Sequence, residues 1–213
     1  MKKQLTIIII IGVLLTGIYL WVKQSREPVS VILNTSNTNE SQVDVLKTYI
    51  NETFKFKISY PSSFIVAEKF VNSYLLPTHW NVYAKDEKKG IPVVSFRIPN
   101  SDEILMGEVR IGVTADKDEI ASCLLPPYPV PVKKIQVNGH DFSVFETSDA
   151  AMNHFSSVTG YRIIHENHCF AIDVLFYGSN GDVYDPPREP AFNRVSAEKK
   201  LEKIIQSFEF LSS

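Results

Sequence analysis

The feature that most constrains this chain of 213 residues is an uncharged apolar stretch near its N-terminus. Residues 5–22 read LTIIIIIGVLLTGIYLWV, with Lys2 and Lys3 before them and Lys23 and Arg26 after them. A helix rises about 1.5 Å per residue, so these residues would cover roughly 27 Å, close to the thickness of a bilayer's hydrocarbon core. The stretch predicts one N-terminal transmembrane helix, residues 5–22, after a short tail of residues 1–4.

A cleaved signal peptide is the alternative interpretation of this stretch. Signal peptides have apolar cores of about 7–15 residues, followed by small residues at the cleavage site. Here the core is longer, and bulky or basic residues such as Trp21 and Lys23 follow it, which favours an uncleaved anchor. The short tail is the simpler side to leave in the cytoplasm. We therefore expect a single-pass membrane protein with a cytoplasmic N-terminus and an extracytoplasmic C-terminal domain.

The charge balance of the rest of the chain excludes one class of partner. Four of the 22 basic residues precede Glu27, so residues 27–213 carry 18 basic and all 24 acidic residues, a net charge of −6. A domain this acidic is a poor candidate for binding phosphate-rich polymers or anionic lipids through a general basic surface. We expect no nucleic-acid partner.

The remaining chain divides by composition into a linker and one domain. Residues 23–42 are rich in Ser, Thr, Asn and Glu, which is typical of a flexible tether. Residues 43–213 are enough for one core of ordinary size. The chain is thus expected to comprise a tail, an anchor, a linker and a single domain.

Strict alternation is the clearest strand signal in that domain. Phe54, Phe56, Ile58 and Tyr60 alternate with polar residues, which predicts a half-buried strand over residues 54–60. Asn138-Gly139 predicts a type I′ hairpin over residues 135–144, and the proline-rich residues 124–131 read as a rigid connection into it. Further strands are expected at residues 46–50 (with a helical turn as the alternative), 64–66, 80–84, 91–98 and 107–114, a second hairpin at 160–164 and 169–177, and a short helix within 116–124.

A helix and a closing strand are expected at the C-terminus. Leu201, Ile204, Ile205 and Phe208 follow i, i+3, i+4, i+7 spacing, and Ser196 is the expected N-cap. Residues 208–210 alternate as a strand would. The predicted fold class is α+β: an antiparallel β-sheet with a few flanking helices.

Four short pieces of sequence carry a resemblance to a known family. Residues 56–64, FKISYPSSF, resemble the F-x-I-x-Y-P-x-x-W/F opening of PsbP-type domains and of small exported bacterial proteins of unknown function. Similar pieces follow in the same order at 137–139 with 148–152, at 161–172 and at 204–210. The resemblance spans nearly all of residues 45–211 and implies a PsbP-like sandwich, but it supplies no functional residue to map onto this chain.

The two cysteines leave two interpretations open. In an oxidising compartment Cys123 and Cys169 could form a disulfide worth about 2–4 kcal/mol; otherwise they are two separate buried thiols. The chain has no CxxC pair, so a metal site built on thiolates is not expected.

His165 and His168 are the weak candidates for a metal site. On a helix their spacing would place both imidazoles on one face, but here they lie between strand-like segments, which indicates a polar hairpin turn. No GxSxG motif is present, and no catalytic residue or cofactor is predicted. We expect a membrane-anchored binding or accessory domain of the cell envelope, whose partners are the membrane, through residues 5–22, and an envelope protein. The alternative is an envelope hydrolase or metal-dependent enzyme that uses His165 and His168.

Overall fold

The computed structural model describes residues 45–70, 76–86 and 89–212, which belong to one compact unit, Val43–Ser213. The predicted transmembrane helix at residues 5–22 and the predicted linker lie outside the described residues. Within the described ranges, no helix is both long and apolar enough to cross a membrane.

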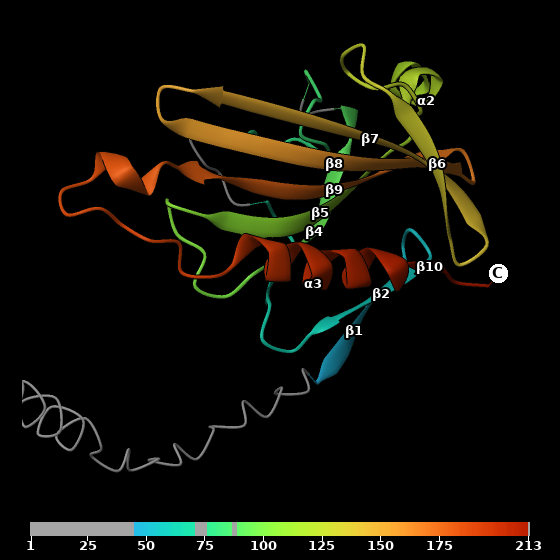
Figure 1. Ribbon diagram of the computed structural model, residues 1–213. Coiled ribbons are helices and arrows are strands. Elements are labelled where there is room, and N and C mark those ends of the chain that lie inside the picture. The colour runs from blue at the N-terminus through green and yellow to red at the C-terminus, as the bar shows by residue number, and fades with distance from the viewer. Residues whose placement is uncertain (1–44, 71–75, 87–88, 213) are drawn as a thin grey trace, which may run out of the picture. The chain divides into compact units, whose positions relative to one another are not determined.

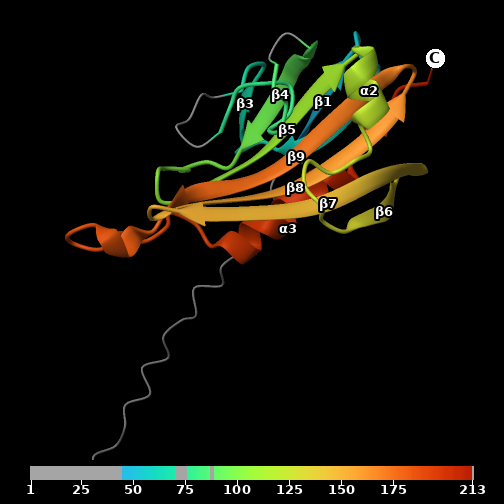
Figure 2. The ribbon, with the colours of Figure 1, turned by 90° about the horizontal axis from the view of Figure 1, so that it is seen from above.

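An antiparallel sheet of seven strands forms the centre of the domain (Figure 1). Viewed from above, β7 and β6 lie at one edge of this sheet and β4 and β3 at the other (Figure 2). The strands in spatial order are β3 (Ile65–Ala67), β4 (Ile91–Arg97), β5 (Met106–Thr114), β9 (His168–Ser179), β8 (His154–His165), β7 (His140–Ala151) and β6 (Val132–Val137).

A smaller antiparallel sheet and three helical segments complete the described elements. The small sheet has the order β1 (Leu46–Asn51), β2 (Phe56–Pro61) and β10 (Glu209–Phe210). The helical segments are α2 (Lys117–Ser122), the 3-10 turn η2 (Gly181–Val183) and α3 (Arg194–Gln206).

The main core lies between one face of the large sheet and the layer made by α3 and the small sheet. Alternate residues of β5 and β9 enter it, and α3 contributes Ala197, Leu201, Ile204 and Ile205. Phe56 and Ile58 of β2 are fully buried, as the alternation of that strand predicts. The α+β class, with antiparallel sheets and few helices, is therefore confirmed.

The opposite face of the large sheet is covered by residues 76–86 and by α2. Trp80 lies so close over β5 that a Cβ atom on Gly112 would approach the Trp80 carbonyl oxygen to 1.7 Å, so this position requires glycine. The predicted strand at residues 80–84 is wrong. Its backbone N–H groups bond to side chains or within the segment instead of to a neighbouring strand. Val82 donates to Asp173 Oδ2 (3.0 Å), Tyr83 to Asn81 Oδ1 (2.7 Å) and Ala84 to the Asn81 carbonyl oxygen (3.2 Å).

Several element boundaries differ from the predicted ones for local reasons. The strand expected to begin at Phe54 begins at Phe56, because Lys55 has a positive φ of 52° and closes the preceding turn. Helix α3 begins at Arg194, and its N-cap is Asn193, whose Oδ1 accepts from the Ser196 N–H at 2.9 Å; the predicted cap at Ser196 is wrong. The Asn138-Gly139 turn has positive φ at both residues, as predicted.

Candidate functional site

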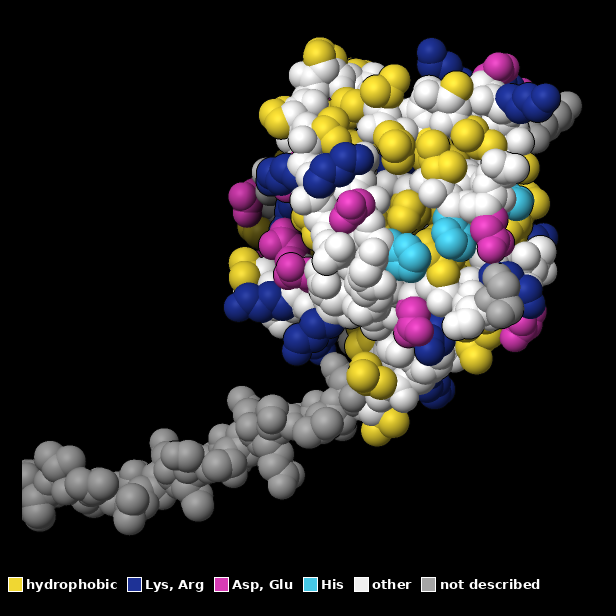
Figure 3. All heavy atoms as spheres, turned by 90° about the vertical axis from the view of Figure 1, so that its right-hand side faces the viewer, with side chains coloured by type: hydrophobic (Ala, Val, Ile, Leu, Met, Phe, Trp, Pro, Cys, Tyr) yellow, Lys and Arg dark blue, Asp and Glu magenta, His cyan; other side chains and the backbone are white. Residues whose placement is uncertain are grey.

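His165 and His168 form the pair that closes the β8–β9 hairpin turn. The His165 ring stacks on Phe210 with 3.8 Å between centroids and lies 5.8 Å from the His140 ring, while His168 Nδ1 lies 2.8 Å from the Glu166 carbonyl oxygen. Figure 3 views this end of the domain, where histidine side chains lie beside hydrophobic ones. In the part of the chain that the structure describes, no group of three or more His, Cys, Asp or Glu is arranged to hold a metal ion. A metal-dependent enzyme that used these two histidines would need a third ligand, and the described residues do not place one beside them.

Cys123 and Cys169 are joined by a disulfide, with 5.9 Å between their Cα atoms. The bond links the end of α2 to the start of β9 and packs with Trp80, Ala84 and Ala171 in a small apolar cluster. Disulfides persist in oxidising compartments such as the periplasm or the extracellular space. The bond thus agrees with an extracytoplasmic location for the domain.

Four buried charged side chains cross the sheet beneath residues 76–86. Glu108 and Arg110 form an ion pair at 2.7 Å on β5, and Asp173 of β9 forms another with Arg162 of β8, also at 2.7 Å. Arg110 Nη1 also donates to the Pro77 carbonyl oxygen at 2.7 Å. These charges neutralise one another and hold the covering segment on the sheet, so they form a structural network rather than an open site.

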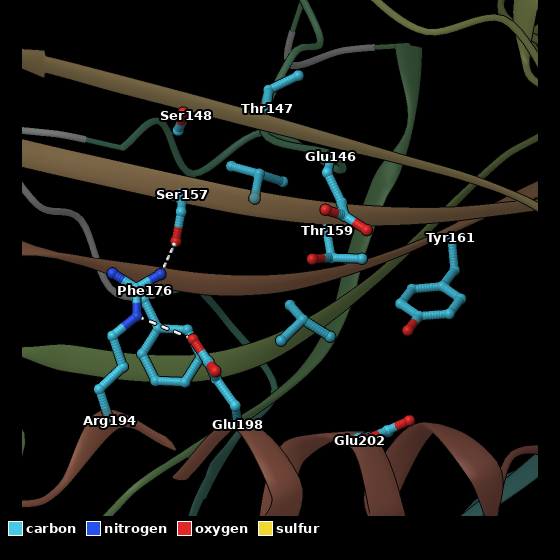
Figure 4. Close-up of a pocket in the computed structure, with 12 residues that line it drawn as sticks. Glu146, Thr147, Ser148, Ser157, Thr159, Tyr161, Phe176, Arg194, Glu198 and Glu202 are labelled. Carbon is cyan, nitrogen blue, oxygen red and sulfur yellow. Dashed lines mark hydrogen bonds and ion pairs between the residues drawn. The ribbon is translucent and has the colours of Figure 1, made fainter. Parts of the chain in front are cut away.

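The candidate functional site is a groove between α3 and the large sheet, with a volume of about 470 Å³ (Figure 4). We call it the α3 groove. Tyr161, Val174 and Phe176 provide its apolar side. Its polar lining comes from strand β7 with Glu146, Thr147 and Ser148, from β8 with Ser157 and Thr159, and from α3 with Arg194, Glu198 and Glu202.

Helix spacing explains how α3 supplies its part of the groove. Arg194, Glu198 and Glu202 recur every four residues, so they lie along one side of the helix. Arg194 donates from Nε to Glu198 Oε1 at 2.9 Å and from Nη2 to Ser157 Oγ at 2.7 Å, and its guanidinium lies 5.1 Å from the centroid of the Phe176 ring. Arg194 therefore ties the start of α3 to β8 at one end of the groove.

The α3 groove is acidic. It is lined by three glutamates and one arginine, and the arginine is already bonded to Glu198. Burial raises the pKa of Tyr161, and the nearby carboxylates Glu202 and Glu146 raise it further because they disfavour a phenolate. Glu146 also pairs with Lys133 at 3.1 Å, but both side chains are about two-thirds exposed, so water and salt screen that pair.

The chemistry of the lining suits binding better than nucleophilic catalysis. Ser157 is held by Arg194, and an arginine cannot act as a general base. None of the described lining residues is a histidine or a cysteine. A cationic or amide-rich ligand would find carboxylates, hydroxyls and an aromatic side chain in one place.

A second groove of about 610 Å³ lies on the opposite face of the same part of the sheet. We call it the tyrosine groove, because Tyr83 and Tyr128 line it with Leu76, Val82 and Val130. The Tyr83 and Tyr128 rings meet edge to face at 6.1 Å, and burial raises the pKa of Tyr83 to about 12. Glu146, Thr147 and Ser148 line both grooves, so the two hollows meet at strand β7.

Sequence reasoning did not find this site. The hairpin of β7 and β8 that builds it turns at Met152-Asn153, where both residues have positive φ (51° and 66°). Asn153 is a permissive residue for that conformation, but Met152 is not, so the usual turn signal is missing. Residues 154–159, at the start of β8, mix polar and apolar residues without strict alternation, so the sequence gives no clear signal for the length of this strand.

Comparison with known proteins returns structural matches only. No family model and no curated protein matches the sequence. A crystal structure of a protein from Bacteroides thetaiotaomicron VPI-5482 is 14% identical, with a TM-score of 0.45 over 78% of this chain and 49% of that one, so this chain spans about half its length. The solution structure of cyanobacterial PsbP (CyanoP) from Synechocystis sp. PCC 6803 is 9% identical, with a TM-score of 0.41 over 79% of this chain and 94% of that one. Neither match assigns a function to this chain.

Proposed function

We propose that this protein is a membrane-anchored binding or accessory module of the cell envelope, which holds a partner protein at the α3 groove. The observation that carries the proposal is the groove itself: an open acidic hollow of about 470 Å³, built by β7, β8, β9 and α3. Its lining offers carboxylates and hydroxyls for polar contacts beside the apolar surface of Tyr161 and Phe176.

Location supports the same proposal. The uncharged residues 5–22 are long enough to anchor the chain, and the disulfide between Cys123 and Cys169 suits an oxidising compartment. A domain tethered in this way meets its partner at the membrane surface, where the two are concentrated together.

Photo-crosslinking in the native host tests the proposal. A photoreactive amino acid at Thr159, inside the groove, is expected to give a discrete adduct with a partner, and the adduct should weaken when Glu202→Lys reverses one groove charge. The matched control carries the same amino acid at Lys199, an exposed position on α3 that does not line the groove. Equal adducts at both positions, or no adduct at Thr159, would contradict the proposal.

A further inference from the structure

Strand β7 has an edge that no described strand pairs with. Strand β6 pairs with β7 from His140 to Phe145, where Val132 is the last partner, whereas β7 continues to Ala151. The stretch Glu146–Ala151 is therefore bonded to β8 on one side only and forms the upper border of the sheet in Figure 1. At about 3.4 Å per residue this free edge is roughly 20 Å long.

The backbone groups that point away from the sheet follow from the register. Val137 and His140 close the two-residue β6–β7 turn, so His140 directs its N–H and C=O toward β6, and so does every second residue after it. The same rule applied from the β7–β8 turn, closed by Ala151 and His154, directs Ala151, Asp149 and Thr147 toward β8. Both counts leave the N–H and C=O of Glu146, Ser148 and Ala150 pointing outward, and no hydrogen bond between described residues uses them.

This edge lacks the lysines, prolines, bulges and short length that often block strand pairing, although it carries two carboxylates, Glu146 and Asp149. Proteins protect exposed edges with lysines, prolines, bulges or very short strands. Strand β6 carries Lys133 and Lys134, and the opposite edge strand, β3, has only three residues. The sequence Glu-Thr-Ser-Asp-Ala-Ala has no proline or lysine, and its pairing with β8 has no register shift. The edge is thus open to an added strand.

The two grooves would receive the side chains of such a strand. Side chains of a strand alternate between the two faces of its sheet. Those on one face would enter the α3 groove, beside Glu146, Glu198 and Glu202, and those on the other face would enter the tyrosine groove, beside Tyr83, Tyr128 and Val130. Charge complementarity calls for basic side chains in the first groove. The apolar part of the second groove, which Leu76, Val82 and Val130 provide, calls for apolar side chains.

A second copy of the same edge is a poor occupant. Self-pairing would gather two Glu146 and two Asp149 carboxylates in one short stretch of sheet, where like charges repel one another. The negative charges therefore select against association of this edge with itself and favour a basic partner.

We infer that the free edge of β7 binds an extended basic segment of a partner protein as an added antiparallel strand, with alternating basic and apolar side chains filling the two grooves. This inference rests on the proposed binding function and specifies the partner. Strand addition derives affinity from main-chain hydrogen bonds and specificity from pockets for alternate side chains.

A synthetic peptide of ten residues, alternating Lys and Val and labelled with fluorescein, tests the inference by fluorescence anisotropy with the full chain in mild detergent. In an antiparallel pair, residues that exchange hydrogen bonds share a face, so the lysines beside Glu146 and Ser148 are the residues whose N–H groups point at β7. N-methylation of the lysine amides is expected to weaken binding about tenfold or more, and N-methylation of the valine amides should change it less than about twofold.

A protein variant provides the matched test. Ser148→Pro removes the central outward N–H, a change that edge strands tolerate, and should also weaken binding about tenfold. Ser148→Ala keeps the N–H and measures the loss of the hydroxyl alone, so the proline variant is expected to bind more weakly than the alanine variant. Circular dichroism of both variants checks that they fold. Should Ser148→Pro fail to fold, the two methylated peptides still decide the question with the unmodified protein.

Each contrary result overturns a distinct claim. Strand addition would be overturned if the two methylated peptides bound equally well. It would also be overturned if a peptide with its lysines and valines in two blocks bound as tightly as the alternating peptide. Either result would leave a charge-driven partner at the α3 groove. No binding of the alternating peptide at all would overturn the inferred partner chemistry. The proposed function is judged separately, because the Thr159 crosslink needs no assumption about strand pairing.

Discussion

Asp173 is the residue on which the covering segment 76–86 depends most. Its carboxylate pairs with the buried Arg162 at 2.7 Å and accepts the Val82 N–H at 3.0 Å. Asp173→Ala would leave Arg162 charged and unpaired beneath the segment, so we expect the free energy of unfolding to fall by about 3–5 kcal/mol. Chemical denaturation measures this loss, and Glu52→Ala, which removes an exposed ion pair with Lys55, is the control with an expected loss of about 0.2–1 kcal/mol.

The outcome that would contradict this role is a loss from Asp173→Ala no larger than that from Glu52→Ala. Removing Arg162 together with Asp173 should restore part of the stability, since the uncompensated charge is then absent.

Tyr161 reports the charge of the α3 groove. Because Glu202 helps to raise the pKa of Tyr161, Glu202→Gln is expected to move the titration of this phenol to lower pH. The change is measured as the difference in ultraviolet absorbance titration between each protein and its Tyr161→Phe derivative, which isolates one of the 9 tyrosines. Glu209→Gln, on β10 and paired with Lys57, is the control that should leave the titration in place. If Glu202→Gln left the titration of Tyr161 unchanged, the claim that groove carboxylates raise the pKa of Tyr161 would be contradicted.

At the scale of elements, the N-cap of α3 can be tested by comparing Asn193 with Ser196, the cap that the sequence predicts. Asn193 Oδ1 accepts the Ser196 N–H, so Asn193→Ala should cost about 1 kcal/mol of stability by losing that bond. Ser196→Ala, at the position that helix spacing alone favoured, should cost little because the Ser196 N–H remains. Denaturation of the two variants side by side decides between the caps, and a larger cost for Ser196→Ala would place the cap at Ser196.

The disulfide ties α2 to the large sheet. Cys123 and Cys169 are 46 residues apart, and the loop-entropy estimate for a bridge of that length is about 4 kcal/mol. Replacing both cysteines by serine should therefore lower the free energy of unfolding by about 2–4 kcal/mol. Adding a reductant should then destabilise the parent protein but not the double variant; an equal response from both would show that the bond does not form.

Elements with a strict period could be predicted from the sequence, and elements that depend on distant partners could not. Strand β2 follows from the alternation of Phe56 and Ile58 with polar residues, and α3 follows from the helical spacing of Leu201 and Ile204. The β6–β7 hairpin follows from Asn138-Gly139, because both residues readily adopt the positive φ of a type I′ turn. Residues 80–84 are apolar enough for a strand, but Asp173, far along the chain, bonds the Val82 N–H and holds them as a loop.

The candidate site depends on such distant contacts even more strongly. Glu146, Ser157 and Glu198 lie on three separate elements, and only the register of β7 with β8 and the position of α3 bring them into one groove. No motif links these residues in the sequence. The histidine pair and the cysteine pair stand out in the sequence because they are rare residue types, whereas the groove is made of common ones.

At the scale of the whole molecule, the proposed binding module combines a predicted N-terminal anchor at residues 5–22, a disulfide-bonded domain and a sheet edge beside an acidic groove. Under the proposed function, the free edge of β7 is the part of the domain that binds the partner, because its outward N–H and C=O groups bond to no described element. Binding is then expected without large rearrangement, since both grooves are already present beside the edge.

Amide hydrogen exchange of β7, measured by NMR on the full chain with and without the alternating Lys-Val peptide, tests this claim most directly. Without peptide, the amides of Glu146, Ser148 and Ala150 should exchange fast, while those of Phe142 and Val144, which face β6, should exchange slowly. With peptide, the first three should become protected and the other two should stay unchanged. Slow exchange of Glu146, Ser148 and Ala150 in the free protein, or no added protection at saturating peptide, would contradict the account.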